Sequence, residues 1–243
     1  MDRGLVSLLD GVALIGAMRE DMIAFLRRHE CLHTVGHCLR VAAEAKTLAL
    51  CFDADPAGAE IAGWLHDISV VIPNDQRVAL AEQLGLAILP EERQLPMILH
   101  QKLSAIFARD LFGIHDPAIL NAIGCHTTLR PAASRLDKVV FLADKIAWDQ
   151  PGQPPYLAEV NVGLQCSLDQ AVFGYVDWLW RRRETLPVVH PWLAAAYAEL
   201  SGGSHRAGWD ERFQAMSAAG DDRLLDPESG SLTRWDANDW EWS

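Results

Sequence analysis

The sequence lacks the features that mark secreted, membrane-spanning and disulfide-bonded proteins. Five cysteines occur in 243 residues, but they are odd in number, scattered and without a CxxC pair, which favours reduced thiols in a cytoplasmic protein. No run of about 18 uncharged apolar residues is present, so no membrane span is expected. The apolar N-terminal segment is interrupted by Asp10 and predicts a helix rather than a signal peptide.

Basic charge is also scarce. Lys and Arg number 21 against 33 Asp and Glu, which gives a formal net charge of −12. This balance argues against non-specific binding to nucleic acid or to an anionic membrane. It does not exclude a phosphate substrate, because a bound metal reverses the local field. The motifs GxxxxGKS/T, GxGxxG and GxSxG are absent, so the chemistries that depend on them are not indicated.

Strand-like alternation of β-branched residues is nearly absent, whereas helical spacing of apolar residues dominates. Asp55–Pro56 and Asp116–Pro117 are helix start signals, with the acid as N-cap and proline at the first helical position. The pattern predicts an all-α protein with helices over 39–52, 55–68, 75–85, 91–111, 116–126, 133–149, 168–184 and 190–200. Loops are expected near 69–75, 86–91, 112–116, 127–133 and 150–165.

Composition divides the chain at two places. The segment 148–157, WDQPGQPPYL, contains three prolines and a glycine that interrupt the helical pattern. The last 24 residues contain seven acids against two arginines, which predicts a mobile acidic tail. We therefore expect an N-terminal helical segment (1–30), a core (31–150), C-terminal helices packed on the core (151–201) and the tail (202–243). The tryptophans of the tail either dock on the domain surface or bind a protein partner.

Histidine and aspartate occupy positions at which helical packing favours apolar residues, as in the run GWLHDISVV (63–71). These positions are His37, His66, Asp67, His100, His126 and Asp144. A buried His or Asp without a partner costs on the order of a few kcal/mol. Imidazole and carboxylate are common ligands of first-row transition metals, so a shared cation would satisfy all of these groups.

Six donors are too many for one tetrahedral site, but they suit two metal ions that share a carboxylate. Asp67, which follows His66 directly, is the natural bridge. Simpler interpretations stay open for the single residues. Each histidine alone can be a core or surface residue, and Asp144 alone can be a salt-bridge partner of Lys145 or Lys138.

The ordered series resembles the HD-domain metal-dependent phosphohydrolases, and most closely their YqeK-type branch, the symmetrical bis(5′-nucleosyl)-tetraphosphatases. The resemblance covers about residues 33–148. It rests on HCLRVAAEAKTLA (37–49), AEIAGWLHDIS (59–69), ILNAIGCHTTLRP (119–131) and SRLDKVVFLADKI (134–146). It implies an all-α HD-domain helical bundle that holds two metal ions, with iron expected and manganese, cobalt or nickel as alternatives.

The resemblance also implies the metal ligands. They are His37, His66, Asp67, His100, His126 and Asp144. His33, one helical turn before His37, is an alternative first ligand. The sequence departs from the family pattern at two places. Gln101 stands where the family usually has glycine, and KIAWDQPGQPP follows Asp144 where the family tends to read YIEP followed by an arginine.

The implied function is hydrolysis of a nucleotide phosphoanhydride, in particular symmetrical cleavage of diadenosine tetraphosphate to two ADP by a hydroxide activated by the two metals. The expected catalytic residues are Asp67, His66 and Lys138. The expected phosphate-binding residues are Arg130, Arg135 and Lys102. The alternatives are another HD-class nucleotidase or phosphodiesterase, and a non-catalytic binding or regulatory module. A homodimer is possible.

Overall fold

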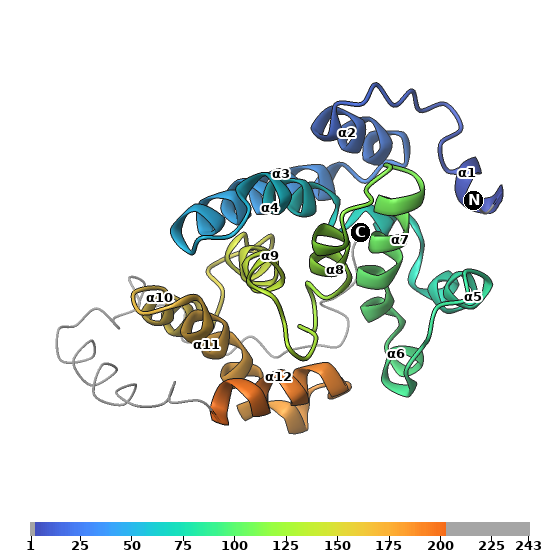
Figure 1. Cartoon of the computed structure of the whole chain (residues 1–243). Coiled ribbons are helices and arrows are strands. Elements are labelled where there is room, and N and C mark those ends of the chain that lie inside the picture. The colour runs from blue at the N-terminus through green and yellow to red at the C-terminus, as the bar shows by residue number, and fades with distance from the viewer. Residues whose placement is uncertain (1–2, 203–243) are drawn as a thin grey trace.

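A computed structural model describes residues 3–202 of the chain, and every regular element within them is a helix (Figure 1). The predicted all-α fold is therefore confirmed, whereas the predicted acidic tail lies outside the described residues. The α-helices are α1 (Arg3–Ser7), α2 (Met18–Arg28), α3 (Leu32–Cys51), α4 (Pro56–Leu65), α5 (Asn74–Gln83), α6 (Pro90–Gln94), α7 (His100–Asp110), α8 (Pro117–Gly124), α9 (Arg135–Ile146), α10 (Leu157–Leu164), α11 (Leu168–Arg181) and α12 (Pro191–Gly202). The 3-10 helices are η1 (Ile68–Val71), η2 (Pro96–Leu99) and η3 (Arg183–Thr185).

The two Asp-Pro signals start helices as expected. The Asp55 carboxylate accepts a hydrogen bond from the Ala57 amide at 3.0 Å at the start of α4. Asp116 accepts one from the Ala118 amide at 2.8 Å at the start of α8. In both cases the side chain satisfies an amide that has no partner within the helix, and proline needs none.

Two predicted elements were wrong in extent. The helix expected over 91–111 is divided into α6, η2 and α7, because Pro96 has no amide hydrogen and disfavours a helical conformation at Leu95. The loop expected over 150–165 contains α10, which packs closely on α11. Its contact is so close that a side chain at Gly163 would meet the backbone of Ala171.

The main hydrophobic core extends from Leu5 in α1 to Leu200 in α12, and a smaller cluster is formed by Ala81 of α5, Leu99 of η2 and Leu103 of α7. Helices α3 and α4 lie side by side at one edge of Figure 1, with α9 and α8 packed beneath them and α7 beside α8. Helices α10 and α11 extend this arrangement beyond α9, and α12 packs on α11. None of the helices in the described part of the chain is long and apolar enough to cross a membrane.

Gly63 allows the close approach of α4 to α3. A β-carbon at this position would lie 2.5 Å from the Ala42 Cα atom and 2.7 Å from the Ala42 nitrogen, and neither backbone atom can move without shifting α3. Ala42 and Gly63 are both buried. The absence of a side chain at Gly63 therefore sets the distance between the helix that carries His37 and the helix that delivers His66.

We expect Gly63→Ala to lower the free energy of unfolding by about 1–3 kcal/mol, because the added methyl group overpacks the α3–α4 contact. Gly36→Ala is the matched control. Gly36 also lies in a helix, but a β-carbon there meets only the end of the Arg40 side chain at 3.5 Å. Alanine should leave stability unchanged or raise it by about 0.5–1 kcal/mol at that position. Urea unfolding of both variants measures the difference, and equal effects would contradict the close-contact explanation.

Candidate metal centre

The six predicted metal ligands come together in the interior. They are delivered from α3 (His37), from the end of α4 (His66 and Asp67), from the start of α7 (His100), from the end of α8 (His126) and from α9 (Asp144). Five of them are buried, and 14% of the Asp144 side chain is exposed. His33, the alternative first ligand, is exposed, so the structure brings His37 and not His33 into the cluster.

One half of the cluster is formed by His37, His66 and Asp144 on one side of Asp67. The His37 Nε2 atom lies 3.0 Å from Asp144 Oδ1 and 3.2 Å from His66 Nε2. The Oδ2 atom of Asp67 lies 3.4 Å from His66 Nε2 and 3.8 Å from His37 Nε2. The ligand atoms of His37, His66 and Asp67 all lie within 4.8 Å of one another, so these three groups could hold one metal ion.

The other half is formed by His100 and His126 on the opposite oxygen of Asp67. The two Nε2 atoms are 2.9 Å apart. Asp67 Oδ1 lies 3.3 Å from His100 Nε2 and 3.5 Å from His126 Nε2. Asp67 thus faces each group with a different oxygen, which is the arrangement expected of a carboxylate that bridges two metal ions.

The hydrogen bonds of the imidazoles show that this cluster suits cations. The Nδ1 atoms of His100 and His126 lie 2.6 Å and 2.8 Å from the carbonyl oxygens of Met97 and Ile123. An Nδ1 that donates to a carbonyl leaves Nε2 as a lone-pair donor in the neutral ring. Two lone pairs 2.9 Å apart repel each other unless a cation lies between them and Asp67. The residues present therefore fit a metal ion.

Burial and charge set the protonation of the cluster. Burial lowers the pKa of His100 to about 3 and also lowers the pKa of His126, so both rings are neutral at pH 7 and available to a metal. Burial would raise the pKa of Asp67, but His66 together with the neighbouring imidazoles of His126 and His100 outweighs it and holds that pKa well below its usual range. Burial opposes a charge on His66, yet Asp67 holds the pKa of His66 well above its ordinary value. A metal ion bound at His66 would displace this proton.

Gln101 positions the loop that carries His126. The Gln101 side chain is fully buried, and its amide nitrogen donates to the Thr128 hydroxyl at 2.9 Å. Its carbonyl oxygen accepts hydrogen bonds from the backbone amides of Thr127 and Thr128 at 3.1 Å and 3.3 Å. The sequence marked Gln101 only as a departure from the family pattern. In the structure the departure supplies three hydrogen bonds between α7 and the segment after α8.

Lys145 is a second residue whose role the sequence did not reveal. Its ammonium lies 2.6 Å from Asp144 Oδ2, so the salt bridge considered as an alternative for Asp144 is present together with the contact to His37. Burial would raise the pKa of Asp144, but Lys145 together with His37 and His66 outweighs it and holds that pKa well below the usual range. The carboxylate is consequently ionised and available to a cation on its other oxygen.

Two of the predicted functional cations form ion pairs elsewhere. The Lys138 ammonium lies 2.7 Å from Asp169 of α11, and the Arg135 guanidinium lies 3.0 Å from Asp53 in an exposed pair. Within the described residues, the ion pairs of both side chains are with these acids and not with members of the cluster. A catalytic role for Lys138 and a phosphate contact for Arg135 stay predictions without support from these positions.

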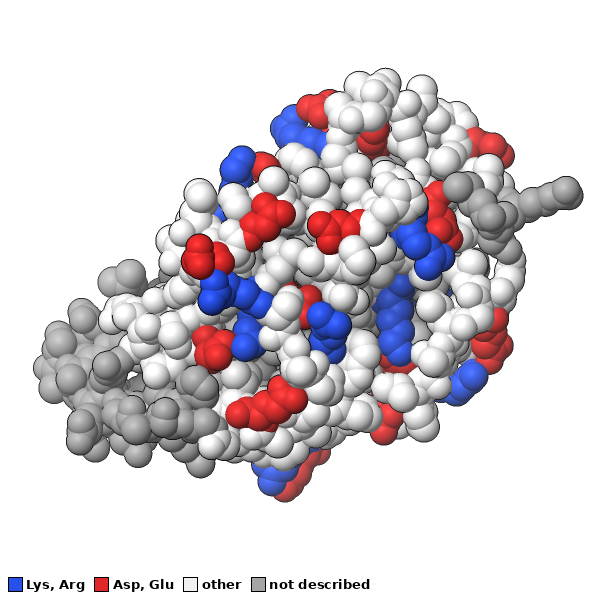
Figure 2. Space-filling view, viewed as in Figure 1, with Lys and Arg blue, Asp and Glu red and all other residues white. Residues whose placement is uncertain are grey.

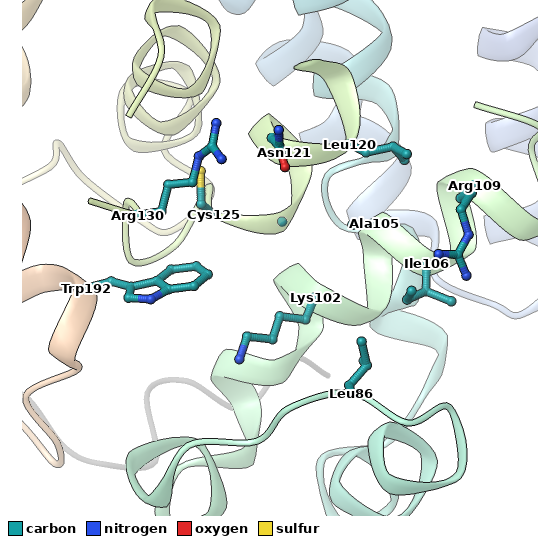
Figure 3. Close-up of a pocket in the computed structure, with 11 residues that line it drawn as sticks. Leu86, Lys102, Ala105, Ile106, Arg109, Leu120, Asn121, Cys125, Arg130 and Trp192 are labelled. Atoms are coloured by element: carbon teal, nitrogen blue, oxygen red, sulfur yellow. The ribbon is translucent and has the colours of Figure 1, made fainter. Parts of the chain in front are cut away.

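The other two predicted phosphate-binding residues line a pocket of about 250 Å³ between α7, α8 and α12 (Figure 3). Lys102 pairs with Glu92 at 2.7 Å and lies 5.5 Å from the centre of the Trp192 ring. Arg130 pairs with Asp137 at 2.7 Å, and both acids are fully buried. The described lining includes none of the six cluster residues. Lys102 and Arg130 therefore neutralise buried acids, and a phosphate contact stays a prediction.

The surface charge agrees with this pairing of cations with acids. On the face shown in Figure 2, Lys and Arg side chains lie among Asp and Glu side chains, and no broad patch of one sign forms.

The five cysteines all lie within the described residues, and each is a free thiol.

Comparison with known proteins identifies the family. The family model described as HD domain matches residues 34–149, a span that contains all six cluster residues. A protein of Bacillus subtilis (strain 168), named Bis(5′-nucleosyl)-tetraphosphatase, symmetrical, is 31% identical over 161 residues, which is 63% of this chain and 81% of that protein. The chain belongs to the HD-domain phosphohydrolases.

Two further similarities place this HD-domain phosphohydrolase among its relatives. A protein of Lactococcus lactis subsp. cremoris, described as an uncharacterized protein in pepC 5′region, is 46% identical over 140 residues, or 58% of this chain and 71% of that protein. A crystal structure from Clostridium acetobutylicum is described as a predicted HD superfamily hydrolase involved in NAD metabolism. It matches with a TM-score of 0.63 at 24% identity, over 82% of this chain and 96% of that one. This structural match supports the fold, and confirms the predicted HD-domain bundle.

We expect Gln101→Ala to lower the free energy of unfolding by about 1–3 kcal/mol, because buried hydrogen-bonding groups lose their partner. Metal affinity should fall by about 10–100-fold, because His126 loses the support of its loop. Gln94→Ala is the control, since Gln94 is exposed and its side-chain amide donates to the Pro187 carbonyl, away from the cluster residues. Chemical unfolding and metal analysis measure both effects. Unchanged metal affinity in Gln101→Ala would refute the positioning role.

Proposed function

We propose that this phosphohydrolase holds two metal ions that share Asp67 and hydrolyses diadenosine tetraphosphate symmetrically to two ADP. The observation that carries the proposal is the placement of Asp67, whose Oδ2 faces His66 at 3.4 Å while its Oδ1 faces His100 at 3.3 Å. A carboxylate with a separate group of imidazoles at each oxygen supports a centre for two ions and not one. Iron is the metal we propose, with manganese, cobalt or nickel as alternatives.

The two proposed sites differ in the number of ligands that the protein provides. The first would use His37, His66, Asp144 and Asp67. The second would use Asp67 and two histidines, His100 and His126. A site with only three protein ligands leaves a position for water or substrate, as catalytic metal sites do.

The chemistry divides between the metals and the protein. When bound, two metal ions would lower the pKa of water and neutralise charge on the phosphate oxygens. Asp67 would fix the separation of the two sites, and the carbonyl-bound imidazoles would hold their ring orientation. In symmetrical cleavage, the water oxygen forms a bond to one of the two central phosphorus atoms, and the bridging oxygen leaves with the other. Each half departs as ADP.

The choice of substrate rests on the relatives and on the nature of the centre. The Bacillus subtilis relative is named for the symmetrical tetraphosphatase activity. The segment after Asp144 departs from the family pattern: Lys145 follows this residue directly and pairs with it at 2.6 Å, and Trp148 comes four residues after it. This observation favours, as a second candidate, hydrolysis of a different nucleotide at the same metals. A homodimer, a protein partner and a cytoplasmic location stay predictions.

Asp67→Ala tests the proposed function. We expect both metal ions to bind more weakly and phosphoanhydride hydrolysis to fall by more than about 100-fold. Loss of a ligand shared by both ions should have a larger effect than loss of a residue that only orients a ligand. The exposed Asp75 of α5 provides the control Asp75→Ala. Metal content is measured by elemental analysis, and products by chromatography.

The assay should include diadenosine tetraphosphate, diadenosine triphosphate, ATP and nucleoside monophosphates. ADP as the sole product of diadenosine tetraphosphate supports the proposal, whereas AMP with ATP would contradict symmetrical cleavage. Hydrolysis of monophosphates without hydrolysis of the tetraphosphate would support the second candidate. Full metal content and activity in Asp67→Ala would refute the two-metal centre.

A further inference from the structure

The two oxygens of Asp144 have different partners. Oδ1 faces the cluster, 3.0 Å from His37 Nε2 and 3.5 Å from His66 Nε2. Oδ2 faces away from it, 2.6 Å from the Lys145 ammonium. A carboxylate can bind a metal through one oxygen or through both. The salt bridge to Lys145 occupies the second oxygen, so the geometry selects binding through Oδ1 alone.

The Lys145 side chain is held on several sides. Only 12% of it is exposed, and its ammonium lies 5.4 Å and 5.7 Å from the ring centres of Phe141 and Tyr175. The Tyr156 hydroxyl donates to the Lys145 carbonyl oxygen at 3.1 Å. A lysine side chain has a flexible four-carbon stem. Burial against these rings removes much of that freedom and fixes the ammonium beside Asp144.

The groups around Lys145 come from two parts of the chain. Phe141 belongs to α9, which also carries Asp144, whereas Tyr175 belongs to α11 and Tyr156 immediately precedes α10. Tyr156 and Tyr175 contact each other with ring centres 4.6 Å apart. Lys145 therefore connects the C-terminal part of the chain to a member of the metal cluster.

We propose that Lys145 is a positioning residue that presents one oxygen of Asp144 to the ion bound by His37 and His66. This inference rests on the proposed two-metal centre. It also gives α11 a role, because Tyr175 of this helix packs against the ammonium. Two effects of Lys145 on metal binding oppose each other. Its positive charge repels a cation, whereas its hydrogen bond orients the ligand. Residues that orient a ligand in this way contribute about 10–100-fold to metal affinity, so orientation should dominate.

The second site provides an internal comparison. His100 and His126 are held by carbonyl oxygens and by the Gln101 network, and the described contacts of these groups do not include Lys145. Loss of Lys145 should therefore weaken one ion and leave the other unchanged. A general loss of structure would weaken both.

The test is a titration of metal-free, full-length protein with Co²⁺, followed by its visible absorption and by calorimetry. We expect wild type to bind two ions per chain. In Lys145→Met, one ion should bind as in wild type and the other about 10–100-fold more weakly. Lys145→Arg should recover part of this loss, because it restores a donor to Oδ2. Lys46→Met is the control. Lys46 of α3 also forms a salt bridge, with Glu60 of α4 at 2.9 Å, and these two helices also carry cluster residues, but this salt bridge includes no cluster residue.

Thermal unfolding with and without Co²⁺ separates positioning from a merely structural role. Positioning predicts a smaller stabilisation by Co²⁺ in Lys145→Met than in wild type. A purely structural lysine would lower the stability of the metal-free protein and leave the stabilisation by Co²⁺ unchanged, which would overturn the proposal. If Lys145→Met does not fold, the same titration of Lys145→Gln and Lys145→Arg decides between these outcomes.

Three results of the titration are decisive. Two ions bound to Lys145→Met with wild-type affinity would overturn the role of Lys145 and leave the proposed function standing. Tighter binding in Lys145→Met would also overturn it, because the lysine would then act mainly as a competing cation. A wild-type protein that binds no Co²⁺, and also none of the other candidate metals, would instead refute the proposed function.

Discussion

The structure depends on the position of one buried carboxylate. Asp67 lies between two groups of imidazoles that come from four different helices or helix ends, and each of its oxygens faces one group. Without a counter-charge this arrangement is unfavourable, because the lone pairs of buried imidazoles face one another and a buried carboxylate lies between them. Bound cations would convert the same arrangement into a stable centre. The apolar packing of α3, α4, α8 and α9 can be understood as the scaffold that keeps these donors in place.

The helices keep the donor groups in place through contacts so close that they leave no room for larger side chains. The absence of a side chain at Gly63 brings α4 against α3, and the Gly63 carbonyl accepts from His66 Nδ1 at 2.8 Å. One residue therefore sets both the helix separation and the ring orientation of a ligand. In the half of the centre that contains His126, Gln101 fixes the segment after α8, and in the half that contains His66, Lys145 fixes Asp144.

The sequence was informative where a residue type conflicts with its surroundings. A histidine or aspartate in an apolar helical run has few explanations, so His66, Asp67 and Asp144 could be identified before the structure. A lysine or arginine at the surface is not unusual for its surroundings, so the sequence gives no signal for its partner. Lys102 neutralises Glu92 of α6, and Arg130 neutralises Asp137 of α9. Only the three-dimensional arrangement shows these pairs. Helix α10 was missed because the preceding prolines obscured a short helix whose stability depends on its contact with α11.

The imidazoles are anchored where helices end. The carbonyl groups of Gly63, Met97 and Ile123 belong to the last turns of α4, η2 and α8, and each accepts from the histidine three residues later. Carbonyls at helix ends have no amide partner within the helix, and they carry the negative end of the helix dipole. Two such ends, those of α4 and α8, converge on this centre, whereas η2 continues directly into α7 and its Met97 carbonyl also accepts the His100 amide. The backbone itself therefore contributes a negative potential that attracts divalent ions, in addition to the charges of the two aspartates.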